Sequence, residues 1–148
     1  MDRGQIMDLS RLGTALALAA VSVEHSAATA MEEACALIEE SAKHAIGTYE
    51  FGWPQLAKST QQERVRLGFS ANEPLFRTGE LRNSIKHEVS RDGHIGFVGT
   101  DVPYAKYHEF GTSTIPARSF LGGALAQNEE RIKRIFAERA YTAIRGPG

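Results

Sequence analysis

The residues best suited to chemistry lie in one short segment, where Tyr104 and Tyr107 accompany the adjacent pair His108 and Glu109. A histidine beside a carboxylate suggests proton transfer or metal binding. Adjacent residues of a helix point in different directions, however, and no second histidine lies at a metal-ligand spacing. We therefore interpret the pair as hydrogen-bonding groups that fix the turn from a helix into a loop.

The other reactive residues do not indicate an enzyme either. His87 and His94 flank an Asp-Gly turn and could meet across it, but we interpret them as parts of an exposed hairpin tip. Cys35 is the single cysteine, cannot form an internal disulfide, and lies among alanines like a small buried hydrophobe. The sequence has no phosphate-binding glycine loop and no serine nucleophile motif. We expect no catalytic residues, no metal and no cofactor.

The composition is that of one soluble globular domain. The chain has 148 residues, 42% of them hydrophobic and 24% charged, enough to bury a sizeable core. Seventeen basic and 18 acidic residues give a net charge of −1, which argues against extensive neutralisation of DNA phosphates. Local basic groups leave DNA contact open as an alternative, although interleaved glutamates favour solvated faces: Lys58, Arg64 and Arg66; Arg131, Lys133, Arg134 and Arg139; Arg77 and Arg82.

No membrane-spanning segment is predicted. The apolar run from Leu12 to Val23 is shorter than the ~20 residues that a spanning helix needs. A signal peptide is the alternative for this run, but Asp2, Asp8 and the helical pattern that continues past Ala30 favour a folded helix.

A helix is predicted at each end of the chain. Apolar residues recur every three or four positions from Leu9 to Ala45, which predicts one long helix over residues 8–47 that Gly47 ends. At 1.5 Å per residue such a helix would be roughly 57 Å long, so we expect it to bend, split or project towards a partner. The second predicted helix covers residues 120–144, with a solvated stretch from Gln127 to Arg131.

Between the helices, residues 75–121 are predicted to form a core of sheet and loop. Ile85–Ser90 and Ile95–Thr100 alternate in polarity around an Asp-Gly turn, which predicts a β-hairpin. A one-turn helix capped by Thr78 should precede it, and a short helix from Tyr104 to Phe110 should follow. The predicted fold is a single α+β domain over residues 1–148, with a small antiparallel or mixed sheet packed against the long N-terminal helix and the C-terminal helix.

Several short motifs resemble a known family when read in order. Residues 77–85 read RTGELRNSI, and VGT, YA, HEFGT and IPARSFL follow from Val98 to Leu121. This series resembles the head-tail joining and tail-completion proteins of tailed bacteriophages and prophages, of the neck type and the Mu-like virion morphogenesis type. The motif positions are Thr78, Gly79, Leu81, Arg82, Ser84, Gly99, Tyr104, Ala105, His108, Glu109 and Gly111.

The resemblance implies a non-enzymatic structural protein of the virion. It implies a homo-oligomeric ring, expected to be a hexamer, at the head-tail junction or the end of the tail tube, as a neck, terminator or completion protein. The expected partners are neighbouring connector and tail-tube proteins, with contact to DNA passing through the ring as a further expectation. Such a protein is made in the bacterial cytoplasm, and a gene transfer agent would fit equally well. The alternative from another class is a nucleic-acid-binding or DNA-processing accessory factor.

The loop after the short helix is the predicted contact between subunits. Glycine, threonine and proline give it a fixed shape, which identical contacts in a ring require. Arg118 is expected to be exposed and to pair with a carboxylate of the neighbouring subunit, so that Arg118→Glu would impair assembly without unfolding the chain; a solvated or internally paired arginine is the alternative. The predicted interface residues are Phe110, Thr112, Thr114, Ile115, Pro116, Arg118 and Phe120.

Overall fold

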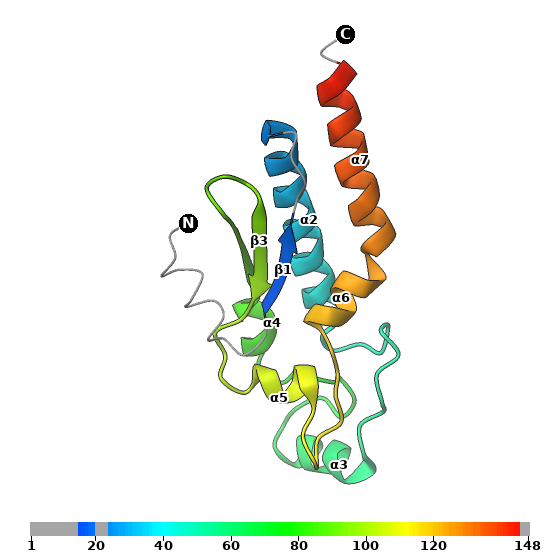
Figure 1. The fold of residues 1–148 in the computed structure, drawn as a ribbon. Helices are drawn as coiled ribbons and strands as arrows, with labels where there is room; N and C mark the ends of the chain where they lie inside the picture. The colour runs from blue at the N-terminus through cyan, green and yellow to red at the C-terminus, as the bar shows by residue number, and fades with distance from the viewer. Residues whose placement is uncertain (1–14, 20–23, 146–148) are drawn as a thin grey trace.

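The structure, a computed structural model, describes residues 15–19 and 24–145 of the chain. These residues form an α+β fold, as predicted, in which one long helix lies between a small sheet and the C-terminal helices (Figure 1). Three short helices and their loops lie at the end of this core that is opposite the C-terminus of the chain. In chain order the elements are β1 (Ala15–Ala19), α2 (Glu24–Ala45), α3 (Lys58–Arg66), α4 (Glu80–Ser84), β2 (Lys86–Val89), β3 (Ile95–Gly99), α5 (Ala105–Phe110), α6 (Leu121–Gln127) and α7 (Glu129–Arg145).

The sheet has three antiparallel strands in the order β1-β3-β2. The predicted hairpin of β2 and β3 is confirmed, and its turn is held by the Asp92 carboxylate, which accepts hydrogen bonds from the Ser90 hydroxyl and the His94 amide. Gly96 allows the sheet to approach α2 closely, because a Cβ at this position would lie 2.3 Å from the Cys35 sulfur. The backbone of β3 at Gly96 therefore packs directly against the side chain of Cys35 on α2.

The prediction of a single helix over residues 8–47 is wrong at its N-terminal end. Ala15–Ala19 is a strand, and it pairs with β3 from Ala15 opposite Gly99 to Ala19 opposite Ile95. The segment reads Ala-Leu-Ala-Leu-Ala, so its leucines fit the period of a strand as well as that of a helix. The backbone hydrogen bonds offered by β3 favour the strand. Residues 1–14 and 20–23, which include the predicted start of this helix at residue 8, lie outside the described residues.

The second half of that prediction is confirmed, because α2 is continuous from Glu24 to Ala45. One face of α2 is buried from Ala27 to Ala45, and Gly47 follows the helix with a φ of 90°, as expected for a left-handed stop. The buried residues of this face include Ala27, Ala30, Met31, Ala34, Cys35, Ile38, Ala42 and Ala45. Burial and then the charge of Glu32 raise the pKa of the Cys35 thiol to about 12, so it stays neutral, as a small hydrophobe would.

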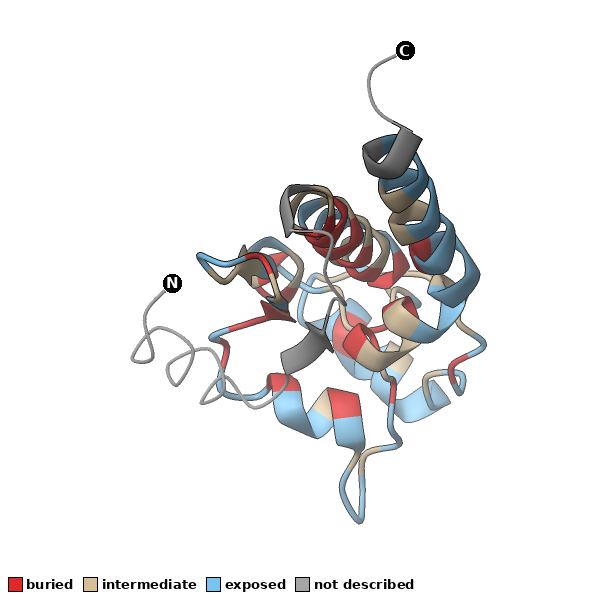
Figure 2. Ribbon diagram, turned by 45° about the horizontal axis from the view of Figure 1, so that its top comes forward, coloured by how far each residue is buried: buried red, intermediate tan, exposed pale blue. Residues whose placement is uncertain are grey.

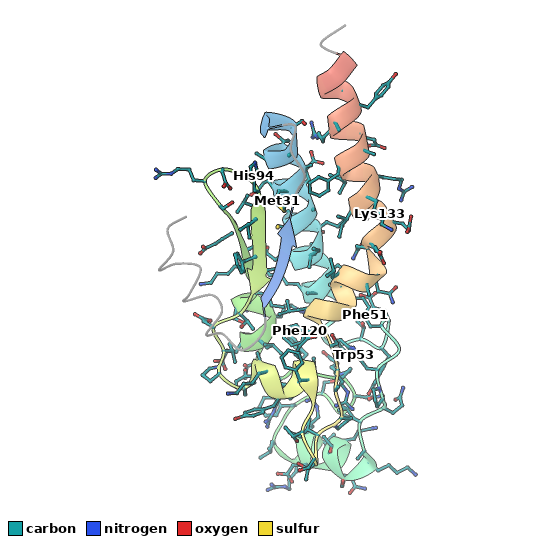
Figure 3. All side chains as sticks on the ribbon, in the orientation of Figure 1. Met31, Phe51, Trp53, His94, Phe120 and Lys133 are labelled. Atoms are coloured by element: carbon teal, nitrogen blue, oxygen red, sulfur yellow. The ribbon has the colours of Figure 1, made fainter. Side chains whose placement is uncertain are left out.

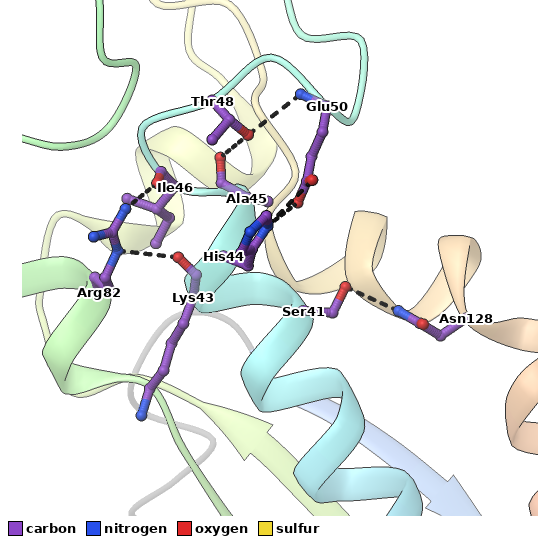
Figure 4. A network of polar contacts seen from close by, with 9 residues as sticks. All are labelled: Ser41, Lys43, His44, Ala45, Ile46, Thr48, Glu50, Arg82 and Asn128. Atoms are coloured by element: carbon purple, nitrogen blue, oxygen red, sulfur yellow. Dashed lines mark hydrogen bonds and ion pairs between the residues drawn. The ribbon is translucent and has the colours of Figure 1, made fainter.

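The predicted C-terminal helix is divided into α6 and α7 at Asn128. The Asn128 side-chain amide donates to the Ala124 carbonyl at 2.7 Å and to the Ser41 hydroxyl at 2.9 Å, which ties the break to α2 (Figure 4). An amide that bonds to nearby backbone competes with helical hydrogen bonding, which explains why the helix changes direction here. The break falls inside the stretch that the sequence identified only as solvated.

The buried core runs from the sheet through α2 to the segment that follows it, as the red ribbon in Figure 2 shows. Trp53 is 8% exposed and packs edge-on against Phe51, so the tryptophan before Pro54 belongs to the core. Figure 3 places both rings near Phe120, at the end of the core where α6 begins.

Arg82 closes the C-terminal end of α2. Its Nε donates to the Lys43 carbonyl at 3.0 Å, its Nη2 donates to the Ile46 carbonyl, and its guanidinium lies 4.5 Å from the Phe76 ring centroid (Figure 4). The last carbonyls of a helix have no partner within the helix, and a cation there also complements the helix dipole. A motif residue on α4 therefore fixes the position of α4 against the long helix.

We expect Arg82→Ala to lower the free energy of unfolding by about 2 kcal/mol, because two carbonyls lose a charged donor. Urea unfolding followed by circular dichroism measures this loss. Arg66→Ala is the matched control, since Arg66 pairs with Glu63 at an exposed site and should cost no more than about 1 kcal/mol. Equal losses for the two variants would contradict a capping role of Arg82.

His87 joins the hairpin to α2 through two carboxylates. Its Nε2 lies 2.7 Å from a Glu32 oxygen and its Nδ1 lies 3.2 Å from a Glu39 oxygen. Burial lowers the pKa of the imidazole, but the hydrogen bonds and charges of Glu32 and Glu39 outweigh burial and raise the pKa above its usual value. His87 is half-buried in this contact, so the prediction that it belongs to an exposed hairpin tip is wrong for this residue. The alternative that it meets His94 across the turn does not hold either, because His94 lies beside Asp92.

The raised pKa of His87 predicts a pH-dependent stability. A group whose pKa is higher in the folded state stabilises fully below its unfolded pKa of about 6.5 and loses that effect as the pH rises through the folded pKa. The difference in unfolding free energy between wild type and His87→Asn should therefore be larger at pH 6 than at pH 8. Urea unfolding at both pH values measures it, and a difference independent of pH would show that folding does not raise the pKa of His87.

Candidate protein-interaction site

The most prominent surface feature is the loop after α5, residues 111–117, which we call the arm. It extends away from the body between α5 and α6, and is the mostly pale-blue loop at the bottom of Figure 2. Gly111 turns the chain with a φ of 75°, and a Cβ on it would lie 2.8 Å from the Ala117 amide nitrogen. The two sides of the arm therefore meet at its base, as only glycine allows.

Hydrogen bonds give the arm a fixed shape of its own. The Thr112 amide donates to the Ile115 carbonyl at 2.8 Å, and the Thr112 hydroxyl accepts from the amides of Thr114 and Ile115 at 3.2 and 3.0 Å. At the base, the Arg118 amide donates to the His108 carbonyl at 2.7 Å. A loop organised in this way has little entropy left to lose when it binds.

Glu109 anchors the arm to α6. Its carboxylate is 7% exposed and accepts hydrogen bonds from the Leu121 amide at 2.8 Å, from the Gly122 amide at 3.2 Å, and from the Ser119 hydroxyl. Backbone amides at a helix start lack partners, and a carboxylate satisfies them well. The interpretation of His108 and Glu109 as hydrogen-bonding groups is therefore confirmed for Glu109, whose bonds hold the far end of the loop at the start of α6, but not for the imidazole of His108.

His108 is a half-buried ring beside Arg118. Burial and then the charge of Arg118 lower the pKa of its imidazole, and its ring packs edge-on against Tyr104 with 5.9 Å between centroids. Its Nδ1 is buried without a hydrogen-bond partner among the described residues. Across residues 15–19 and 24–145, no group of three or more histidine, cysteine or acidic side chains could hold a metal ion.

The prediction that Arg118 is an exposed contact residue is wrong. It is 5% exposed, and its guanidinium donates to the Pro54 carbonyl at 3.1 and 2.8 Å and to the Gln55 carbonyl at 3.3 Å. The alternative of an internally paired arginine is the right one. The returning side of the arm passes the segment after Trp53, where these carbonyls would otherwise lack donors. Phe120, also predicted to lie at an interface, is fully buried in the core.

The other predicted interface residues do lie on the surface. Phe110 is 69% exposed, Thr112, Thr114 and Pro116 are exposed, and Ile115 is half-buried. The predictions omitted Tyr107, which is 46% exposed one helical turn before Phe110. The spacing of three between two aromatic residues was the signal that could have identified it. We call Tyr107 and Phe110 the aromatic face of α5.

A cleft of about 760 Å³ lies on another side of α5, between α5, α4 and α3. Its volume is in the range of sites that bind small molecules or side chains. Arg64 is one of its walls and is buried, donating to the carbonyls of Ser70, Glu73 and Phe76. The apolar lining consists of Leu56, Leu67, Phe69, Leu75 and Leu81, and the polar lining includes Thr60, Glu63, Arg77, Thr78, Glu80, Tyr104 and His108.

Most motif residues shape the fold or the cleft. The Ser84 hydroxyl donates to the Leu81 carbonyl and bonds to the buried Thr100 hydroxyl, which joins α4 to the end of β3. Thr78 accepts from the Glu80 amide but is not itself the cap of α4, because Gly79 occupies that position with a φ of 86°. Leu81, Gly99 and Ala105 are buried. These motif residues thus hold α4, the hairpin and α5 in contact with one another.

A comparison with protein families identifies the family of the chain. The model of the phage virion morphogenesis family matches residues 8–139. The chain belongs to this family. Searches of curated proteins and of solved structures gave no significant match.

Membership of the phage virion morphogenesis family gives the chain a structural role in the bacteriophage particle. The matched region, residues 8–139, includes the motif series, the arm and the cleft. Proteins that build a virion act through contacts with other proteins, so the exposed apolar side chains on α5 and around the cleft are the features to explain. No helix of the described residues is long and apolar enough to cross a membrane.

Proposed function

We propose that this virion morphogenesis protein forms a ring at the head-tail junction or at the end of the tail tube, and completes the tail there. The observation that carries the proposal is the family match over residues 8–139 together with a stiff arm that projects beside an exposed aromatic face. A ring requires each copy to present the same rigid contact to the next, and the hydrogen bonds within the arm supply that rigidity. Proteins of the connector and the tail tube are the expected neighbours.

The basic groups support protein contact over DNA contact as the main role. Arg64 is buried on backbone carbonyls, Arg66 pairs with Glu63, and Arg139 pairs with Glu33. Lys133 lies 3.3 Å from Glu129 and 3.4 Å from Glu130. Cations already paired with carboxylates release fewer counterions when they meet phosphate, so these groups form a weak DNA surface.

Electron microscopy of particles that lack this chain tests the proposal. We expect full heads with unattached tails, or tails of uncontrolled length, and restoration of normal particles when the wild-type gene is supplied in trans. Particles of normal form and infectivity without the chain would overturn it. Antibody labelling of wild-type particles should mark the neck or the tail end, and labelling elsewhere on the particle would also overturn it.

A further inference from the structure

The exposed hydrophobic side chains gather at one end of the molecule. Seven large hydrophobic residues are exposed among those whose side chains the structure describes, and five of them lie on α3, just after it, or at α5. These five are Val65, Leu67, Tyr104, Tyr107 and Phe110. Exposed apolar side chains gathered at one end of a molecule mark a contact with another molecule.

This surface consists of a projection and a hollow on different sides of α5. Successive residues of a helix are rotated by about 100°, so Tyr104 and His108 share the side that lines the cleft, whereas Tyr107 and Phe110 lie on another side. Among the described residues that line the cleft, none belongs to the aromatic face or the arm of the same copy. Each copy therefore presents an unfilled apolar cleft and an uncovered aromatic projection.

The charges beside the two features include one complementary pair. The arm has no charged side chain, and Lys106, exposed beside the aromatic face, is 5.4 Å from the Tyr107 ring centroid. At the cleft, the guanidinium of Arg64 is used by backbone carbonyls and that of Arg77 lies 4.5 Å from the Phe69 ring centroid. Of the exposed carboxylates in the same lining, that of Glu63 pairs with Arg66, and that of Glu80 accepts a hydrogen bond from the Tyr104 hydroxyl at 3.2 Å. The lining as a whole is therefore balanced in charge, and Glu80 is the acidic group that can face the cation beside the projection.

We propose that Phe110 and the arm of one copy insert into the cleft of a second copy, with Lys106 of the first facing Glu80 of the second. The contact is head to tail, because the two surfaces differ, and head-to-tail contacts close into rings when the rotation permits. The inference rests on the proposed ring and deepens it by naming the surfaces that join its copies. The arm binds at small entropic cost because its shape is already fixed.

Photo-crosslinking of the full chain during particle production tests the contact. Phe110 is replaced by p-benzoylphenylalanine, cells are irradiated, and the linked peptides are identified by mass spectrometry. We expect a covalent dimer of this chain that joins position 110 to the segment 56–81. A link to another virion protein, a link to a different part of the chain, or no dimer overturns the inference. The control places the crosslinker at Tyr141, which is 62% exposed on α7 and should give no link to residues 56–81.

A charge exchange identifies the facing pair. In the crosslinking chain, Lys106→Glu should reduce the dimer several-fold, and adding Glu80→Lys should restore it, since each contact then has its charges reversed. Reduction without restoration would remove Lys106 and Glu80 from the contact. The outcomes separate this inference from the proposed function: defective particles with Phe110 linked to another protein would leave the function standing and the inference wrong. If particles are normal when the chain is deleted, but the crosslinked chain gives arm-to-cleft dimers, the inference would stand and the proposed function would be wrong.

Discussion

Arg118→Glu is expected to destabilise the fold severely, lowering the free energy of unfolding by about 4 kcal/mol. The guanidinium, 5% exposed, makes three hydrogen bonds to the carbonyls of Pro54 and Gln55. A carboxylate in its place would be a buried charge facing two carbonyl oxygens, without a donor. Since domains have about 5–15 kcal/mol in total, much of the variant should be unfolded or aggregated at 37 °C. Thermal unfolding followed by circular dichroism measures the loss.

Arg66→Glu is the matched control for this charge reversal. Arg66 pairs with Glu63 at an exposed site on α3, so reversal there should cost no more than about 1 kcal/mol. Arg118→Lys separates charge from geometry, because an ammonium keeps the charge but cannot bond two successive carbonyls as a fork does. If Arg118→Glu were as stable as wild type and failed only in assembly, Arg118 would contact a neighbouring subunit after all.

Phe120→Ala should lower the free energy of unfolding by about 3–5 kcal/mol, because Phe120 is fully buried and its removal leaves a cavity where α6 begins. Phe110→Ala is the natural comparison, since the same residue type is 69% exposed there and truncation should change stability by no more than about 0.5 kcal/mol. Urea unfolding of the two variants measures both effects. Similar losses for the two phenylalanines would contradict this assignment of core and surface.

The elements with strong local signals were predictable from sequence. The hairpin of β2 and β3 was predicted because alternating polarity and an Asp-Gly turn give the same result. α5 and its stop at Gly111 were predicted because a left-handed glycine ends a helix in a recognisable way. The strand β1 was missed because a short Ala-Leu repeat fits both periods, and its partner β3 lies about 80 residues further along the chain.

The candidate site was predictable in place but not in detail. Glycine, threonine and proline identified the arm, and Phe110, Thr112, Thr114 and Pro116 are exposed there. Burial of Arg118 was not readable from the sequence, because it depends on carbonyls more than 60 residues earlier that only the fold brings close. The cleft was missed for the same reason. Its walls come from three helices and the loops between them, and no single segment has its pattern.

Chemical labelling of Cys35 can report how often α2 separates from the sheet. The thiol is fully buried between α2 and β3, with its pKa raised to about 12, and it is the only cysteine in the sequence. Thiol reagents attack the thiolate, so labelling requires α2 to separate from the sheet and admit water. The labelling rate under native conditions therefore measures how often this contact opens. Outside the reducing cytoplasm, in the virion, the sulfur of Cys35 is protected from oxidation for as long as the contact between α2 and the sheet stays closed.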